Sequence, residues 1–88
     1  MKTSFRNSFL RDLKAIRDKQ LLSRVKEVIE HVEKTDSLTT LPNLKQLKRE
    51  KNYYRIRIGE YRLGLAVQDD NVVFIRFLHR REIYRYFP

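Results

Sequence analysis

The 88-residue chain has no cysteine and no long apolar run, and each absence narrows the class of protein it can be. Without cysteine, no disulfide can cross-link the fold, which suits a protein made in a reducing compartment. No apolar stretch approaches the length that a membrane span or the core of a signal peptide needs. We therefore expect a soluble cytoplasmic protein with no membrane partner.

The sequence also has few of the residue patterns that hold metals or cofactors. His31 and His79 are far apart, and the carboxylates do not cluster, so no set of metal ligands is recognisable. Only two glycines are present, which excludes a glycine-rich phosphate loop, and no Ser-His-Asp set stands out. We expect a function that needs neither a metal nor a cofactor.

Positive charge is what the chain has in excess. Twenty Lys and Arg residues stand against eleven Asp and Glu, for a formal net charge of +9. Such a balance favours a polyanionic partner, because each neutralised phosphate releases counterions. The alternative is a basic surface with no ligand. The excess is larger in residues 45–88 than in residues 1–44, so the second part of the chain is the place to look.

The first part of the chain predicts one short strand and two helices. A chain of this length forms a single domain with a small core, so its stability should depend on good packing or on a partner. Residues 2–5 can form an edge strand, and a helix over about residues 8–18 can have Asn7 or Ser8 as its N-cap. A second helix is predicted by apolar residues at helical spacing from Leu21 to Val32.

The second part of the chain predicts three strands. Residues 37–52 read as a connection with at most one turn of helix. Strands follow over residues 53–58, 61–68 and 72–78, and Gly59-Glu60 suits a two-residue type II′ hairpin turn. The fold class is therefore α+β, a small antiparallel sheet of three clear strands and an N-terminal strand, packed against two N-terminal helices.

The first hairpin turn determines which side chains share a face of the sheet. With Gly59 and Glu60 in the loop, Arg57 lies opposite Arg62 and Arg55 lies opposite Gly64. These residues form a basic face. The other face receives the helices and carries Tyr54, Ile56, Ile58, Tyr61, Leu63 and Leu65.

The second turn is best read as a three-residue loop over residues 69–71, with Asn71 in the left-handed conformation. This reading puts Arg76 on the basic face beside Gly64, whereas a two-residue turn would bury Arg76 among leucines. If the alternation continues, Arg80 joins the same face. The apolar face would then gain Val73, Ile75 and Phe77.

The basic face carries a local conflict. Arg57 directly opposite Arg62 costs stability unless an anion lies between them, and such conflicts often mark functional sites. Gly64 and Ala66 on this face would leave a shallow trough where a nucleic-acid backbone could approach. The alternative is an ordinary exposed sheet face on which water screens the arginines.

The hairpin YYRIRIGEYRLGLAV followed by VVFIRFLHRREIY resembles the RelE/ParE toxin superfamily. The resemblance implies a ribosome-dependent endoribonuclease that cuts mRNA in the ribosomal A site and is neutralised by a cognate antitoxin. It also implies site residues at Arg55 and Arg57, at Arg62, at Arg80 and at Tyr84. The partners expected from it are the antitoxin, the ribosome and mRNA.

Attack of a 2′-hydroxyl on the scissile phosphate needs a proton acceptor, charge stabilisation and a donor for the leaving oxygen. Arginine stays protonated, so the acceptor is expected to be Tyr84 or His79. The strand alternation points His79 toward the helix side of the sheet, however, so it can equally be a packed histidine. The predicted catalytic residues are Arg57, Arg62, His79, Arg80 and Tyr84, and the predicted RNA-binding residues are Arg55, Arg57, Arg62, Arg76 and Arg81.

Two other functions stay open at this point. A ParE-like protein would inhibit DNA gyrase by binding it, and a catalytically silent homologue would bind RNA without cutting it. Among the remaining residues near the site, Glu60 and Glu82 are expected to do no more than pair with arginines, and Tyr86 and Phe87 to contact the core or the antitoxin.

Overall fold

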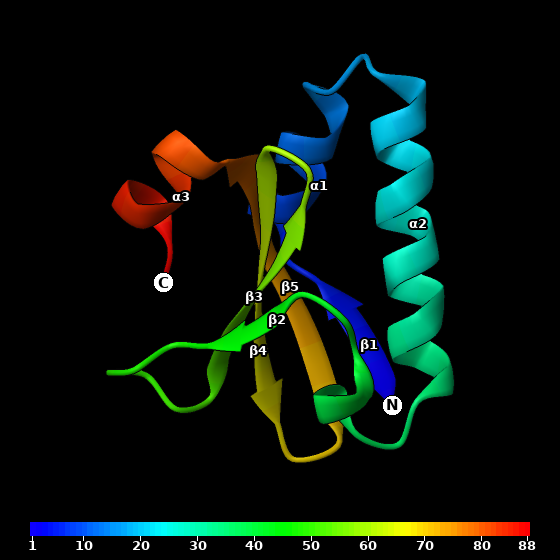
Figure 1. The fold of residues 1–88 in the computed structure, drawn as a ribbon, viewed down its shortest axis with the longest axis vertical. Helices are drawn as coiled ribbons and strands as arrows, with labels where there is room; N and C mark the ends of the chain where they lie inside the picture. The colour runs from blue at the N-terminus through cyan, green and yellow to red at the C-terminus, as the bar shows by residue number, and fades with distance from the viewer.

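A five-stranded sheet in the order β1-β5-β4-β3-β2 organises residues 1–88 in the computed structural model (Figure 1). Helices α1 and α2 pack on one face of this sheet and α3 packs on the other, which confirms the α+β class. The strands are β1 (Lys2–Phe5), β2 (Leu44–Gln46), β3 (Tyr53–Ile58), β4 (Tyr61–Gln68) and β5 (Asn71–His79). The helices are α1 (Asn7–Lys14), α2 (Lys19–Lys34) and α3 (Arg80–Tyr86), with a 3-10 turn at Leu38–Thr40.

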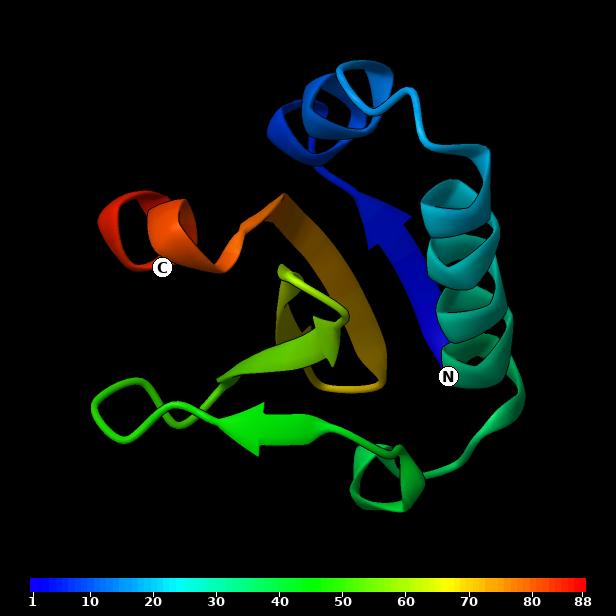
Figure 2. The same ribbon diagram turned by 45° about the horizontal axis from the view of Figure 1, so that its top comes forward.

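The N-terminal strand is at an edge of the sheet, as predicted, but it makes the sheet mixed. β1 runs parallel to β5, with Thr3 opposite Val72, whereas every other pair of strands is antiparallel. Figure 2 shows β1 between α2 and β5. The backbone N–H of Arg6 donates to the carbonyl of Phe74 at 2.9 Å, and this bond leads the chain directly from β1 into α1.

The first helix is shorter than predicted because the residues after it lead into the N-cap of the second helix. α1 ends at Lys14, and Asp18 is the N-cap of α2, where its carboxylate accepts the N–H groups of Gln20 and Leu21 at 3.0 and 3.2 Å. The predicted caps Asn7 and Ser8 are wrong, because α1 begins at Asn7. Ser8 instead donates its hydroxyl to the carbonyl of Ile75 at 2.6 Å.

Two elements were missed in the sequence. The connection over residues 37–52 contains the edge strand β2, which pairs with β3 through three residues. Residues after His79 do not extend the sheet but form α3. Arg80 is therefore the first residue of a helix, and the prediction that it continues the alternation of β5 is wrong.

The hairpin of β3 and β4 has the predicted register. Arg57 lies opposite Arg62, Arg55 opposite Gly64, and Ile58 opposite Tyr61. Gly59 has φ +60°, the left-handed value that the first position of a type II′ turn requires and that favours glycine. Ile56, Leu63 and the other residues of the predicted apolar face accordingly pack toward α1 and α2.

The turn between β4 and β5 differs from the prediction. Gln68 pairs with Asn71, so the loop has two residues, and Asp69 rather than Asn71 has a positive φ, of 57°. A register shift follows: Leu65 lies opposite Phe74, but Gly64 lies opposite Arg76. This β-bulge skips one residue of β5, and it keeps Arg76 on the basic face despite the shorter loop.

The shorter turn and the bulge together change the predicted positions of two β5 residues. Val73 lies opposite Ala66, on the face that α3 covers, and Ile75 is the skipped residue of the bulge, so neither belongs to the core under α1 and α2. Phe77 does belong to that core, as predicted, and Phe74 joins it.

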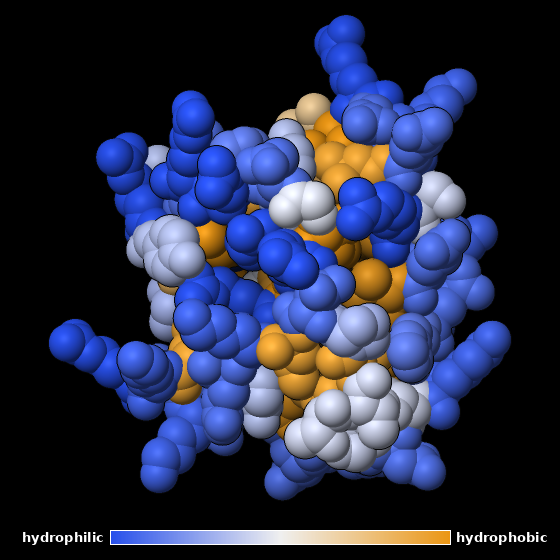
Figure 3. Space-filling model, viewed as in Figure 1, coloured by the Kyte–Doolittle hydropathy of each residue, from blue (hydrophilic) through white to orange (hydrophobic).

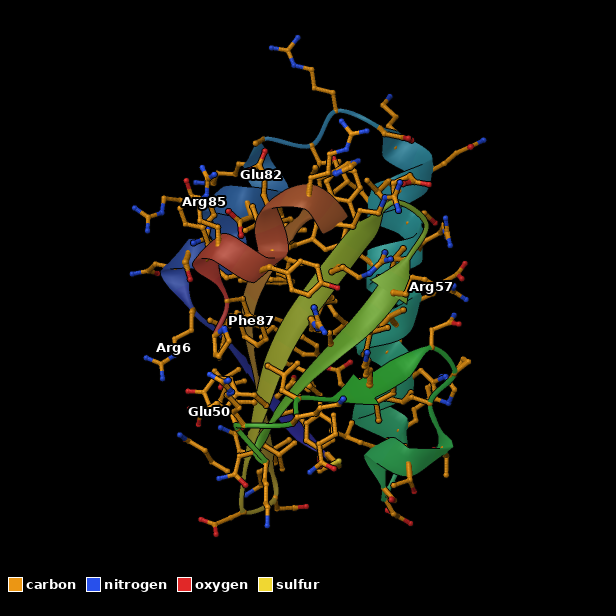
Figure 4. The ribbon with its side chains drawn as sticks, turned by 60° about the vertical axis from the view of Figure 1, so that its left-hand side comes forward. Arg6, Glu50, Arg57, Glu82, Arg85 and Phe87 are labelled. Atoms are coloured by element: carbon orange, nitrogen blue, oxygen red, sulfur yellow. The ribbon has the colours of Figure 1, made fainter.

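A second, smaller apolar cluster lies under α3. Ala66, Val73, Ile83 and Phe87 are all buried but are not part of the main core. Figure 4 shows Phe87 folding back from α3 onto the strands. The trough predicted beside Gly64 and Ala66 is therefore filled by an aromatic ring, not left open for a ligand. None of the helices is long and apolar enough to cross a membrane.

Candidate nucleic-acid interface

A surface pocket of about 290 Å³ lies on the basic face, beside α3 and against the edge strand β2. Figure 3 shows hydrophilic side chains gathered on the side of the molecule that carries α3 and the loop between β2 and β3. The pocket is lined by Asn43, Leu44, Lys45, Arg55, Arg57, Arg62 and Tyr84. Four of these seven side chains are cationic, and none is acidic.

The cross-strand pair Arg57 and Arg62 lies at the centre of this pocket, as the register predicted. Arg57 donates from Nη2 to Oδ1 of Asn43 at 3.0 Å, and Arg62 donates from Nη1 to the carbonyls of Gly59 and Tyr61 at 3.0 and 2.9 Å. These neutral oxygens hold each guanidinium in place but leave its charge uncompensated. The repulsion between the two arginines is thus retained in the folded protein.

Ion pairs are confined to the margins of the basic face. The structure has two, Arg76 with Asp12 at 2.8 Å and Arg80 with Glu60 at 2.7 Å. Glu60 therefore pairs with an arginine as expected, through an exposed contact that is weak in water. Arg55, Arg57 and Arg62 have no carboxylate within salt-bridge distance, so their charges are available to an external anion.

Tyr84 connects this pocket to a second one. Its ring is 70% exposed and lies under the guanidinium of Arg55, whose Cζ is 4.4 Å from the ring centroid. The second pocket, of about 460 Å³, is lined by Arg62, Arg80, Arg81 and Tyr84. α3 therefore brings Arg80, Arg81 and Tyr84 next to the strand arginines, although they follow the last strand in sequence.

Arg76 does not join this group. It lies opposite Gly64 as predicted, but its Nε and Nη2 donate to the Asp12 carboxylate at 2.8 and 3.1 Å. The same carboxylate accepts the backbone N–H of Phe77 at 2.8 Å. The hydrogen bond to Asp12 raises the pKa of Arg76, against the opposing effect of burial. Arg76 therefore fastens β5 to α1, and it lines neither pocket.

His79 also lies outside both pockets. It is opposite Tyr61 on the helix side of the sheet, in an edge-on contact with the Tyr61 ring at 5.5 Å. Its Nδ1 accepts the backbone N–H of Arg81 at 3.2 Å, which makes His79 the N-cap of α3. The direction predicted from the strand alternation is confirmed, and in the structure His79 positions the helix that carries Arg80, Arg81 and Tyr84.

Sequence reasoning missed three residues of the pocket, Asn43, Leu44 and Lys45. Asn43 follows Pro42 in a turn dipeptide and has φ 64°, a conformation that asparagine tolerates. Its side-chain contact with Arg57 depends on the pairing of β2 with β3, which a strand of three residues does not reveal by alternation. Lys45 lies opposite Arg55 for the same reason.

The geometry suits a polyanion with exposed phosphates and bases. Arginine guanidinium groups bind phosphate through paired N–H donors, and an exposed tyrosine provides a surface on which a base can stack. No cluster of three or more His, Cys, Asp or Glu side chains is close enough to hold a metal ion. The cationic groups that line the two pockets are arginines and Lys45.

Comparison with known proteins gives a consistent result. Residues 4–84 match the family model described as the ParE toxin of the type II toxin-antitoxin system parDE. The chain is 43% identical to toxin RelE3 of Methanocaldococcus jannaschii, over the full length of both proteins. In solved structures it resembles a chain of the RelB-RelE antitoxin-toxin complex from Methanococcus jannaschii, with a TM-score of 0.82 and 40% identity over 96% of this chain and 98% of that one.

A more distant match has the same fold. It is a chain of the toxin-antitoxin complex RelBE2 of Mycobacterium tuberculosis, with a TM-score of 0.67 and 28% identity over 90% of this chain and 96% of that one. The full-length identity, the family match and the shared fold all agree with the resemblance seen in the strands. The chain belongs to the RelE/ParE superfamily of toxins from type II toxin-antitoxin systems.

Proposed function

We propose that this toxin is a ribosome-dependent endoribonuclease that inhibits translation in the cytoplasm by cutting mRNA in the ribosomal A site. The observation that carries the proposal is the group of arginines without carboxylate partners, Arg55, Arg57 and Arg62, next to the exposed ring of Tyr84. Such a group binds a phosphate and stabilises the charge that develops on it during cleavage.

The proposed reaction is a transesterification. The 2′-oxygen attacks the adjacent phosphorus, a 2′,3′-cyclic phosphate forms, and the bond from phosphorus to the 5′-oxygen breaks. Arg57 and Arg62 bind the non-bridging oxygens, and the nearby Arg80 and Arg81 add charge from α3. The attacking hydroxyl gives its proton to an acceptor, and the leaving oxygen receives one.

Two side chains that line the central pocket can exchange protons, Tyr84 and Lys45. We assign the acceptor role to Tyr84, because arginine does not release a proton and His79 faces the helix side of the sheet. The ammonium group of Lys45 is the proton source for the leaving oxygen. His79 acts as a positioning residue through its cap on α3.

Programmed ribosomes test this proposal when the mRNA ends are mapped after incubation with the toxin. Arg62→Ala and Arg80→Ala should each slow cleavage by about 10²- to 10³-fold, as expected for the loss of one charge-stabilising donor. Tyr84→Phe should slow it by about 10²- to 10⁴-fold. Arg17→Ala, an exposed arginine outside both pockets, is the matched control. The proposal would be contradicted if the wild-type protein left mRNA uncut, or if the Arg62 and Arg80 variants cut mRNA as fast as the wild type.

A second candidate function rests on the family model, which is that of the ParE toxin. A ParE-like protein would inhibit DNA gyrase and would leave mRNA intact. A supercoiling assay with the purified protein separates the two functions. A third outcome, ribosome binding without cleavage, would identify a catalytically silent RNA-binding homologue.

We also propose a cognate antitoxin as the physiological partner. The solved relative from Methanococcus jannaschii is a complex of an antitoxin with a toxin. An antitoxin that neutralises this chain should cover the basic face or displace α3, because both carry the proposed site. Protection of Arg57 and Tyr84 from chemical modification in the complex would support this mode of binding.

A further inference from the structure

The basic face continues beyond the proposed site as a row of three neighbouring pockets, which together are here called the groove. The pocket near α3 and the central pocket share Arg62 and Tyr84. The central pocket shares Lys45 and Arg55 with a third pocket, of about 380 Å³, that lies against the loop between β2 and β3. Because each neighbouring pair has two lining residues in common, the three pockets lie side by side from α3 to this loop.

The loop over residues 47–52, here called the arm, projects from the body of the molecule (Figures 1 and 2). Hydrogen bonds nevertheless hold its shape. Leu47 N–H donates to the carbonyl of Tyr53 at 2.9 Å, Tyr53 N–H donates to the carbonyl of Glu50 at 2.9 Å, and Gln46 Nε2 donates to the carbonyl of Lys51 at 2.7 Å. The arm is therefore an ordered extension of the β2–β3 hairpin.

The charge of the third pocket matches that of the proposed site. Its lining includes Lys45, Lys48, Arg49 and Arg55, against one carboxylate side chain, that of Glu50. Lys48 and Arg49 are exposed and have no carboxylate within salt-bridge distance. A loop that only needed to be soluble would not have to direct its cations into a pocket shared with Arg55.

We propose that the arm is a second phosphate-binding segment, which holds single-stranded RNA on one side of the phosphate that is cut. This inference rests on the proposed function and names where the flanking RNA lies. Lys48 and Arg49 bind backbone phosphates without reading the bases, while Tyr84 offers a stacking surface further along the groove. A single strand fits this arrangement because its bases are free to stack.

The test measures binding of 2′-O-methyl oligouridines, which have no 2′-hydroxyl to react, to the free protein by fluorescence anisotropy. The double variant Lys48→Ala/Arg49→Ala should bind a nine-nucleotide strand about tenfold more weakly near 0.15 M salt, and its salt slope should fall by about 1.4. A three-nucleotide strand, too short to span the groove, should show a much smaller loss. The matched control is Lys26→Ala/Lys34→Ala, which removes two exposed cations from α2.

Three outcomes would overturn the inference. The first is an equal loss of affinity in the arm variant and the α2 control. The second is a loss that is as large for the three-nucleotide strand as for the nine-nucleotide strand. The third is competition by duplex RNA that is as strong as competition by the single strand. Cleavage on ribosomes reports separately on the proposed function. If the arm variant binds the nine-mer like the wild type while the wild type cuts mRNA, the arm inference fails and the proposed function stands. If the arm variant binds the nine-mer more weakly but the wild type leaves mRNA intact, the arm inference stands and the proposed function fails.

Discussion

Substitution of Gly64 by alanine tests how α3 is seated on the sheet. A Cβ atom at this position would lie 2.7 Å from Cδ1 of Phe87 and 2.8 Å from its Cγ and Cε1. Carbon atoms do not approach so closely, so the ring or the strand must move. Overpacking of this kind costs about 1–3 kcal/mol. Expulsion of the Phe87 ring sets an upper limit, because burying a phenylalanine contributes about 1.5–3 kcal/mol.

The expected net effect of Gly64→Ala is a loss of about 1–2 kcal/mol, since alanine in a strand regains about 0.5–1 kcal/mol over glycine. For a domain of this size the melting temperature should fall by roughly 5–15 °C. Urea unfolding followed by circular dichroism measures the free energy of unfolding. RNA binding should weaken as well, because a displaced α3 moves Tyr84 away from Arg55.

A double-mutant cycle isolates the contact between Gly64 and Phe87. In a Phe87→Ala background there is no ring to displace, so Gly64→Ala should become neutral or stabilise the protein by about 0.5–1 kcal/mol. If Gly64→Ala costs the same free energy with and without the ring, Phe87 does not occupy the surface above Gly64. The reasoning about α3 would then be refuted.

Three further predictions concern the ion pair, the turns and the anion site. Asp12→Ala should destabilise the protein by about 1.5–3 kcal/mol in thermal unfolding, because Arg76 loses both hydrogen bonds to the carboxylate; an effect below 0.5 kcal/mol would contradict this. Asp69→Gly should raise the free energy of unfolding by about 1 kcal/mol and Gly59→Ala should lower it by a similar amount, since both positions have positive φ; effects of the same sign would count against the turn geometry. Phosphate at constant ionic strength should stabilise the wild type, by about 1.4 kcal/mol at ten times its Kd, and equal stabilisation of Arg62→Ala would place the anion elsewhere.

The centre of the candidate site was predictable from the sequence because it depends on one local feature. Gly59-Glu60 sets a two-residue turn, and the alternation of side chains then places Arg55, Arg57 and Arg62 on one face. Nothing distant in sequence is needed for this result. His79 also lies on its predicted side of the sheet, but only because the bulge in β5 compensates for the shorter turn that precedes this strand.

The margins of the site depend on long-range packing, and there the sequence was less informative. The periodicity of β5 does not reveal the bulge opposite Gly64 and Leu65. This bulge compensates for the one-residue change in register that the shorter turn causes. The ion pair of Asp12 with Arg76 joins residues that are far apart in sequence, so no local pattern predicts it. Phe87 closes the trough over Gly64 from the far end of the chain, a contact that neither local sequence predicts.

The placement of carboxylates separates scaffold from site. Asp12 joins α1 to β5 through Arg76, and Glu60 joins the turn after β3 to the start of α3 through Arg80, whose backbone N–H also donates to the Glu60 carbonyl at 2.8 Å. Both ion pairs hold together elements that border the basic face.

Between these two ion pairs, the cross-strand arginines of the central pocket keep only neutral hydrogen-bond partners. A carboxylate there would relieve the repulsion between Arg57 and Arg62 but would occupy the donors that an RNA phosphate needs. The fold therefore retains an unfavourable contact of up to about 1 kcal/mol in the free protein, and a bound phosphate removes it. The strain on the empty site and the affinity for RNA that we propose for it would have the same physical origin.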